Sequence, residues 1–331
     1  MKHIMMEGTT NRRDFLLRLL KGGLSITAAC TLGYWLYDGT GPRPGEEQVT
    51  KVILPDFSMV SPRGKMSIVS GLDRVKTIKR GLEALGGIET FVKQGDRVLL
   101  KVNAAFASPP IISATSNPHL VAEIARLCYK AGASKVVVTD NPINDPASCF
   151  SLTGIEEAAR LAGAKVLLPK QSYFQPTTVS DGVLIRNWPI LWEPFQGIDK
   201  VIGVAPVKDH HRSGASMTMK NWYGLLGGSR NVFHQDIHNI IKELAIMVKP
   251  TLVVLDGTTT MMTNGPTGGS LEDLKETGTM IVSTDQVAAD AFGATLLGKK
   301  PTELPYIAKA EGAGIGTADY ESLNPVRLSV A

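Results

Sequence analysis

Cysteine is scarce in this chain of 331 residues. Its three cysteines, Cys30, Cys128 and Cys149, stand far apart and form no C-x-x-C pair. Such a set cannot supply a disulfide framework or a four-cysteine metal site. Cys128 falls within an apolar helical pattern, so we expect it to be a small buried hydrophobe.

The chain also lacks a run of charges of one sign, and aromatic residues make up only 6% of it. Its formal net charge is +4. Without a run of lysine and arginine interleaved with aromatics, we expect no nucleic-acid partner. The glycine patterns that hold dinucleotides or nucleotide phosphates at a strand–helix turn are missing as well, so nothing favours a nucleotide loop.

The N-terminal segment resembles a twin-arginine export signal. Arg12 and Arg13 precede Phe15 and Leu16, and an apolar stretch follows over residues 22–37. A basic region followed by an apolar region is typical of an export signal, although an amphipathic start with a chance arginine pair would look similar. A spanning helix needs about 20 apolar residues, so the stretch is marginal as a permanent anchor.

We therefore expect residues 1–48 to form a signal or anchor and a linker, with the linker rich in Gly, Pro and Glu at 39–48. The expected partner is the twin-arginine translocase, which would place the protein on the periplasmic or extracellular side of the membrane. No clean cleavage site follows the apolar stretch, so both cleavage and retention as an anchor remain open. The twin-arginine route carries folded proteins, often with a cofactor already inserted.

The body of the chain, residues 49–331, alternates between patterns typical of strands and of helices. Continuous apolar runs predict parallel strands buried on both faces, and helical spacing predicts the helices between them. The alternation predicts an α/β fold, a mostly parallel sheet flanked by helices, in one domain or in two lobes with a cleft between them. Strands are predicted at 50–54, 97–102, 135–140, 165–168, 200–204, 251–256 and 279–283, a hairpin at 177–188, and helices at 70–85, 117–128, 154–161, 234–248, 285–297 and 302–311.

Polar residues follow several predicted strands, at the edge where ligands gather in open parallel sheets. The candidates are Asn103, Asp140 with Asn141, residues 208–212, Asp256, and Thr284 with Asp285. Lys101 lies two residues before Asn103, so the two side chains share one face of the strand. A buried lysine needs a partner or a function, whereas a lysine at the edge of the sheet would lie in solvent, and both interpretations remain open.

Histidine is rare too, and four of the six histidines fall between Lys208 and His238. His234 and His238 are spaced i and i+4, which lets two imidazoles on one helix share a metal. The glutamate of a metalloprotease helix is absent between them, and the same spacing arises by chance on exposed helix faces. His210 follows a predicted strand. A mixed histidine and carboxylate set would suit zinc, nickel or iron without a choice among them.

Cationic and glycine-rich segments follow in the same region. Lys220, next to Asn221, joins Arg212 and Arg230 as side chains that could hold a carboxylate or a phosphate. Glycine permits a backbone to approach a ligand closely. The loop around Gly265 is therefore a candidate for ligand binding, or a plain surface turn.

Taken in order, these motifs resemble the domain of unknown function 362 family over roughly residues 50–300. The resemblance implies little about activity, because the family's biochemical role is largely unassigned, but many members are linked to iron–sulfur proteins. This chain lacks the ferredoxin-type cysteine run, so we expect no cluster of that type within it, and a partner subunit would have to supply one. The matching residues are Lys101–Asn103, Thr115–Pro118, Ala131–Ala133, Val136–Asp140, Lys208, His210, Met219–Asn221, Gly224, Asp256, Gly257, Gly265–Gly268 and Ser283–Asp290.

We predict an exported protein, redox-associated or metal-dependent, that acts on a small anionic ligand in a cleft. Lys220 and Arg212 would bind the anion, His210 would transfer a proton or ligate a metal, and Asp256 would orient the ligand or ligate the metal. The predicted site residues are His210, Lys220 and Asp256 for catalysis; Lys101, Asn103, Arg212, Asn221, Gly265 and Asp285 for ligand binding; and His210, His234 and His238 for a transition metal.

Two other classes of function remain open. One is a non-catalytic binding protein or accessory subunit of an iron–sulfur-containing membrane redox complex. The other is a distant racemase-like enzyme that uses a nickel cofactor held by histidine and lysine. The metal content of the matured protein and its co-purification with a membrane partner would separate these classes.

Overall fold

The computed structural model describes residues 12–36, 53–59, 64–180 and 182–331. The chain divides into two units, Met1–Val49 and Thr50–Ala331. The predicted linker at 39–48, residues 50–52 of the first predicted strand and Asp181 of the predicted hairpin lie outside the described residues. Ile53 and Leu54, the described part of that first strand, belong to no strand.

The first unit contains helix α1, Arg12–Leu36. Its segment Phe15–Leu32 has a mean hydropathy of 1.4 and is long and apolar enough to cross a membrane. An export signal near an N-terminus has the same properties. The helix accommodates hydroxyl residues because Ser25, Thr27 and Thr31 each donate a hydrogen bond to the carbonyl four residues earlier.

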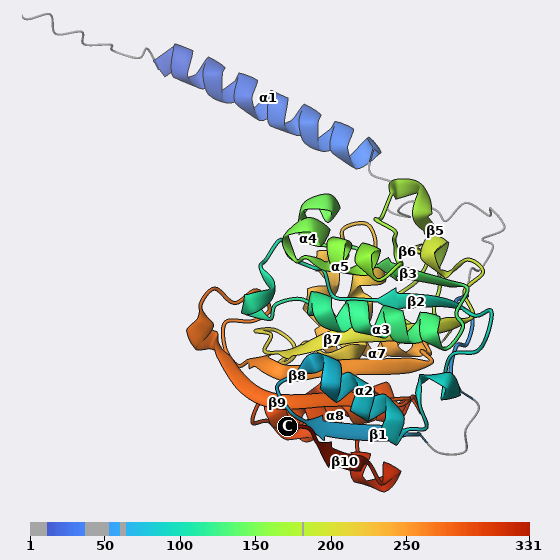
Figure 1. The fold of residues 1–331 in the computed structure, drawn as a ribbon. Helices are drawn as coiled ribbons and strands as arrows, with labels where there is room; N and C mark the ends of the chain where they lie inside the picture. Colours follow the sequence, from blue (N-terminus) through green and yellow to red (C-terminus); the bar gives the residue numbers. More distant parts are fainter. Residues whose placement is uncertain (1–11, 37–52, 60–63, 181) are drawn as a thin grey trace, which may run out of the picture. The chain divides into compact units, whose positions relative to one another are not determined.

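The second unit is built on an eight-stranded sheet with the order β10-β1-β9-β8-β7-β2-β3-β4 (Figure 1). Neighbouring strands are parallel except where β9 pairs with β1 and β8. The predicted α/β fold with a mostly parallel sheet is therefore confirmed. The strands are β1 Met66–Ser70, β2 Arg97–Lys101, β3 Lys135–Thr139, β4 Lys165–Val166, β7 Lys200–Lys208, β8 Leu252–Met261, β9 Leu274–Ser283 and β10 Val326–Ser329.

Helices cover both faces of this sheet, and a hydrophobic core lies on each face. Side chains alternate along a strand, so Leu99 enters one core while Val98 and Leu100 enter the other. Burial on both faces explains the continuous apolar runs of the central strands. The core that contains Leu100 is closed by α2 Arg74–Ala84, α3 Pro118–Lys130 and α5 Ile155–Leu161, and the core that contains Leu99 by α6 Thr218–Asn221, α7 Ile237–Met247, α8 Gln286–Leu296 and α9 Pro305–Gly312.

Several element boundaries differ from the predictions. The helix predicted at 70–85 begins later, at Arg74, because Asp73 caps α2, and strand β1 before it has no counterpart among the predicted elements. The hairpin predicted at 177–188 is instead the connection between β5 Phe174–Thr177 and β6 Trp188–Leu191, which form a separate two-stranded antiparallel sheet. Strand β10 and helix α4, Pro146–Leu152, have no counterpart among the predicted elements.

The order of the strands creates a crevice beside β2. The chain adds β3 and β4 on one side of β2 and then returns to place β7 on its other side. At such a reversal the loops after the two central strands leave in opposite directions, and a crevice opens at their carboxyl ends. Because Thr50–Ala331 forms one unit, this crevice lies within it and not between two lobes.

Candidate functional site

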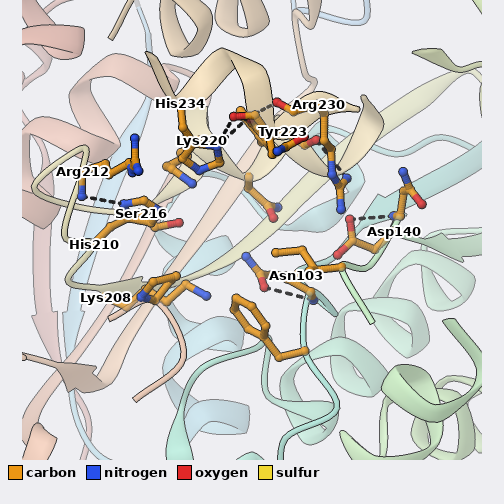
Figure 2. A pocket seen from close by; sticks show the side chains of 18 of the residues that line it. Asn103, Asp140, Lys208, His210, Arg212, Ser216, Lys220, Tyr223, Arg230 and His234 are labelled. Carbon is orange, nitrogen blue, oxygen red and sulfur yellow. Dashed lines mark hydrogen bonds between the residues drawn. The ribbon is translucent and has the colours of Figure 1, made fainter. Parts of the chain in front are cut away.

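A cavity of about 550 Å³ occupies the carboxyl ends of β2, β3 and β7. Asn103 follows β2, Asp140 follows β3 and Lys208 ends β7. Figure 2 shows these three side chains around the same space with Lys220, which comes from α6, and Arg230. The crevice predicted from the strand order is therefore lined by charged side chains.

Lys101 does not face this cavity. It is fully buried, and its ammonium lies 2.7 Å from Asp140 Oδ1. The same ammonium donates to the backbone carbonyls of Val102 at 2.8 Å and Asn221 at 2.9 Å. A lysine ammonium has three donors, so these partners saturate it. Asp140 and two carbonyls occupy its donors, which leaves none for the predicted ligand.

Asn221 and Gly224 hold this ion pair in place. The Asn221 amide donates to the carbonyls of Lys101 and Val204, both at 3.2 Å, and so ties α6 to β2 and β7. At Gly224 a Cβ atom would lie 2.0 Å from Asp140 Oδ1 and 2.8 Å from Lys101 Nζ. Asn221 therefore borders the cavity with its amide already used, and Gly224 is required for the close approach of the backbone to the ion pair.

Lys208 is the second buried lysine at the end of a central strand. Its side chain is 1% exposed, donates to the Ala114 carbonyl, and lies 5.1 Å from the centre of the Phe106 ring. Burial lowers the pKa of Lys208 to about 7, and the positive charge of Lys220 acts in the same direction. Within the described residues no carboxylate forms an ion pair with Lys208.

Lys220 has even fewer partners. It is 8% exposed, and its ammonium lies 5.1 Å from the centre of the Tyr223 ring. Among the residues that the structure describes, no hydrogen bond or ion pair reaches its Nζ atom. Burial lowers the pKa of Lys220 to about 7, and the charge of Arg230 adds to the effect. The cavity thus contains two lysines that are near their midpoint of titration at neutral pH.

His210 is a fixed, neutral imidazole. It is 2% exposed, and its Nδ1 atom accepts from the backbone N–H groups of Arg212 at 3.2 Å and Ser213 at 3.3 Å. These bonds leave the ring proton on Nε2. Burial, with the nearby charge of Lys220, lowers the pKa of His210 to about 2. His210 is therefore able to donate a hydrogen bond from Nε2, but it does not become cationic at neutral pH.

The histidines do not form the predicted metal site. His234 belongs to the 3₁₀ segment Arg230–Asp236, whereas His238 lies in α7, so the two do not stand one turn apart on a single α-helix. The His238 ring lies 6.3 Å from the Tyr306 ring and does not line the cavity. In the described part of the chain no three His, Cys, Asp or Glu residues are grouped to hold a metal. With His210 Nδ1 also engaged, the residues present do not fit a resident metal.

Asp256 and Asp285 also lie away from the cavity. Asp256 points to the face of the sheet covered by α2, where it forms an ion pair of 2.7 Å with Arg74. Asp285 caps α8 by accepting from the backbone of Val287 and Ala288. Because β9 is antiparallel, its carboxyl end lies at the opposite edge of the sheet, and Asp285 follows it there. The structure therefore does not bring either carboxylate to the cavity.

The loop around Gly265 packs against the backbone of Asp209, next to His210. A Cβ atom at Gly265 would lie 1.9 Å from the carbonyl oxygen of Asp209, so glycine is required for this packing. The neighbouring Pro266 lines the cavity. Gly265 therefore positions the histidine loop rather than contacting a ligand, which corrects its predicted role. Arg212 is exposed and lines the cavity.

Arg230 and Tyr223 form a wall of the cavity. The Arg230 guanidinium donates to the carbonyls of Tyr223, Leu226 and Pro142 and meets no carboxylate within the described residues. The Tyr223 hydroxyl contacts His234 Nδ1 at 3.0 Å. Arg230, Tyr223 and His234 also line a second cavity of about 550 Å³.

The balance of charge in the first cavity is strongly positive. Lys208, Arg212, Lys220 and Arg230 line it, and the single carboxylate among its lining residues, Asp140, is bound to Lys101. Converging cations without acidic partners create a positive potential that favours an anionic ligand. Arginine and lysine are the side chains that bind carboxylates and phosphates.

Residues 98–295 match the family described as Domain of unknown function (DUF362), which covers more than half of the chain. The chain belongs to the DUF362 family. It is 28% identical over 257 residues to a thylakoid-associated protein of Synechocystis sp., covering 74% of this chain and 76% of that protein.

Two solved structures show weaker similarity. The lactate racemase apoprotein from Thermoanaerobacterium thermosaccharolyticum has 13% sequence identity and a TM-score of 0.36, over 71% of this chain and 57% of that chain. A Thermotoga maritima protein has 14% identity and a TM-score of 0.32, over 55% of this chain and 50% of that chain. This chain therefore spans less than two thirds of the length of either solved chain.

The predicted site omits three residues that matter to this DUF362 cavity. Lys208 and Asp140 are among the polar candidates at the predicted strand ends, but neither is among the predicted site residues. Asp140 follows a buried strand, at a position where a ligand contact is expected. Tyr223 carried no signal, because an aromatic residue next to Trp222 is indistinguishable from a core residue. Of the predicted residues, the structure brings Asn103, His210, Arg212, Lys220, Asn221 and His234 together around the cavity.

Proposed function

We propose that the chain binds a small anion with a carboxylate or phosphate group in the cavity at the ends of β2 and β7. The observation that carries this proposal is that Lys208 and Lys220 are buried there without a carboxylate partner among the described residues. Burying a cation without a partner is unfavourable, and a bound anion would supply the missing charge. Asn103 and the Nε2–H group of His210 provide hydrogen-bond donors around it.

Anion binding then couples to proton uptake. Both lysines have a pKa of about 7 in this structure, and an adjacent negative charge raises the pKa of an ammonium. The ligand therefore shifts the lysine with which it pairs toward its charged form. Groups that titrate close to the working pH are suited to general acid–base catalysis, so the activity that this site supports best is proton transfer on a small anionic substrate.

Calorimetric titration of the full chain with inorganic phosphate and with acetate tests this proposal. Replacing Lys208 or Lys220 by methionine should weaken phosphate binding roughly tenfold or more, which corresponds to about 1.4 kcal/mol. Lys135→Met is the matched control, because Lys135 is exposed at the other end of β3, and it should leave the affinity unchanged. Equal affinities of all three variants and the unchanged protein would contradict the proposal.

We also propose that the protein is exported and held at a membrane by its N-terminal helix. This is supported by Arg12 and Arg13 ahead of the apolar segment Phe15–Leu32, and by the similarity to the thylakoid-associated protein of Synechocystis. Replacing both arginines by lysine should retain the protein in the cytoplasm of its native host, as measured by cell fractionation. Unchanged export would refute this part of the proposal.

A further inference from the structure

The two lysines of the cavity differ in what surrounds the amine. Lys208 Nζ donates a hydrogen bond to the Ala114 carbonyl, which favours its protonated form. Lys220 Nζ has no such acceptor within the described residues, and it lies beside the ring of Tyr223. Both side chains line the cavity (Figure 2). The Lys208 amine is held as a donor, whereas the Lys220 amine is free to react with a ligand.

We propose that Lys220 is a nucleophile that forms an imine with an aldehyde or ketone group of the bound anion. The inference rests on the proposed function, and it narrows the ligand to a carbonyl compound that carries a carboxylate or phosphate. A lysine becomes a nucleophile when burial or neighbouring cations remove its proton. Lys220 has both conditions.

The charged and titratable groups around Lys220 act in one direction. Lys208 comes from β7, His210, His211 and Arg212 from the loop after it, and Arg230 and His234 from the segment before α7. Every one of them is cationic or neutral, and the nearest carboxylate of the cavity wall, Asp140, is bound to Lys101. Burial, with the charge of Arg230, lowers the pKa of Lys220 to about 7, so much of the amine is neutral at physiological pH.

Imine formation requires no oxidant or reductant. The Lys220 lone pair attacks the carbonyl carbon, a C–N bond forms, and the carbonyl oxygen takes a proton from the Lys208 ammonium. The nitrogen loses one proton to Lys208, and the Lys208 ammonium then protonates the hydroxyl group, so that a C–O bond breaks and water leaves. The resulting iminium returns its N–H proton to Lys208, and the net change is amine plus carbonyl to imine plus water. Lys208 acts as the proton carrier, and a cavity of about 550 Å³ admits a small oxo acid.

Glyoxylate is a suitable probe because it is a small anion with an aldehyde. The full chain is incubated at pH 7 with glyoxylate and sodium cyanoborohydride, which reduces an imine to a stable carboxymethyl-lysine, and the modified residues are mapped by peptide mass spectrometry. We expect Lys220 to be modified at least tenfold faster than the exposed Lys135, with a rate that saturates with glyoxylate and falls when phosphate is added.

Lys220→Arg separates this inference from anion binding, because arginine keeps a charge but is not a nucleophile. The variant should still bind phosphate, which also shows that it is folded, while the fast modification disappears. Lys135→Arg should leave the fast modification intact. If Lys220 is modified no faster than Lys135 in a protein that binds phosphate, the imine proposal fails and the anion site stands. If fast modification of Lys220 occurs without phosphate binding, the anion site fails instead.

Discussion

Lys101 and Lys208 end neighbouring strands of one sheet. They differ in whether a carboxylate lies beside the ammonium group. Both side chains are fully buried and both donate to backbone carbonyls. Lys101 also has Asp140 at 2.7 Å, whereas Lys208 has no carboxylate in the described residues. Lys101 is therefore part of the framework, whereas Lys208 is the lysine that we propose to bind an anion.

Removing the carboxylate of the paired lysine should have the largest effect. In Asp140→Ala the Lys101 ammonium remains buried without its counter-charge, and breaking a buried pair in this way costs about 3–5 kcal/mol. The free energy of unfolding, measured with denaturant, should fall by that amount. Asp199→Ala removes the exposed ion pair with Arg97 and should cost less than about 1 kcal/mol. Similar losses of unfolding free energy in the two variants would show that the buried pair of Lys101 contributes no more than an exposed ion pair.

Crowding the pair should cost less than breaking it. In Gly224→Ala the added methyl would lie 2.0 Å from Asp140 Oδ1, so the pair must move, and overpacking of this kind costs roughly 1–3 kcal/mol. Gly269→Ala is the matched control, because a Cβ atom at Gly269 meets nothing within 4 Å. Thermal unfolding of the two variants checks the prediction, which is wrong if they melt together.

The unpaired lysines should make stability depend on pH. Lys208 and Lys220 have a pKa of about 7 in the folded chain, against an ordinary value of 10.5. Between these values the unfolded chain binds more protons, so the free energy of unfolding should rise as the pH increases from 7 toward 9.5. Lys220→Met should flatten this rise by roughly 1–2 kcal/mol. Denaturant unfolding at several pH values measures it, and an unchanged slope would show that Lys220 is charged in the folded state.

The smallest effect on binding is expected on the other face of the sheet. Asp256→Asn weakens the ion pair with Arg74 and should lower stability by roughly 1 kcal/mol. Because Asp256 lies away from the cavity, the affinity for phosphate should stay within a factor of two. A large loss of affinity in calorimetry would show that Asp256 contributes to the anion site, and that its assignment to the other face of the sheet is wrong.

Local patterns were sufficient for most of the framework. The run at 135–140 is a strand because valines buried on both faces fit a central parallel position, and Asn117 with Pro118 begins a helix because the side chain caps it. Local patterns did not predict β1, a five-residue strand whose position depends on pairing with β9 and β10. Such pairing involves residues far away in the chain, which a short window cannot contain.

The candidate site shows the same division. Its location past the strand ends and its cationic character are visible in the sequence, since both depend on residue type and on the order of strands and helices. Asp285 and Asp256 were misplaced because the direction of β9 and the face of β8 decide where those carboxylates lie. The pairing of Lys101 with Asp140, and the lack of a partner for Lys220 within the described chain, arise only when distant segments meet.

The sequence by itself determined the family, the parallel α/β architecture and the edge of the sheet where charged residues gather, because these follow from periodicity and motif order. Only the tertiary structure decided which lysine is neutralised and which is not. The reason is electrostatic: the effect of a buried charge depends on partners within a few ångströms. Those partners come from α6, from the loop after β3 and from the loop after β7, which the sheet brings together.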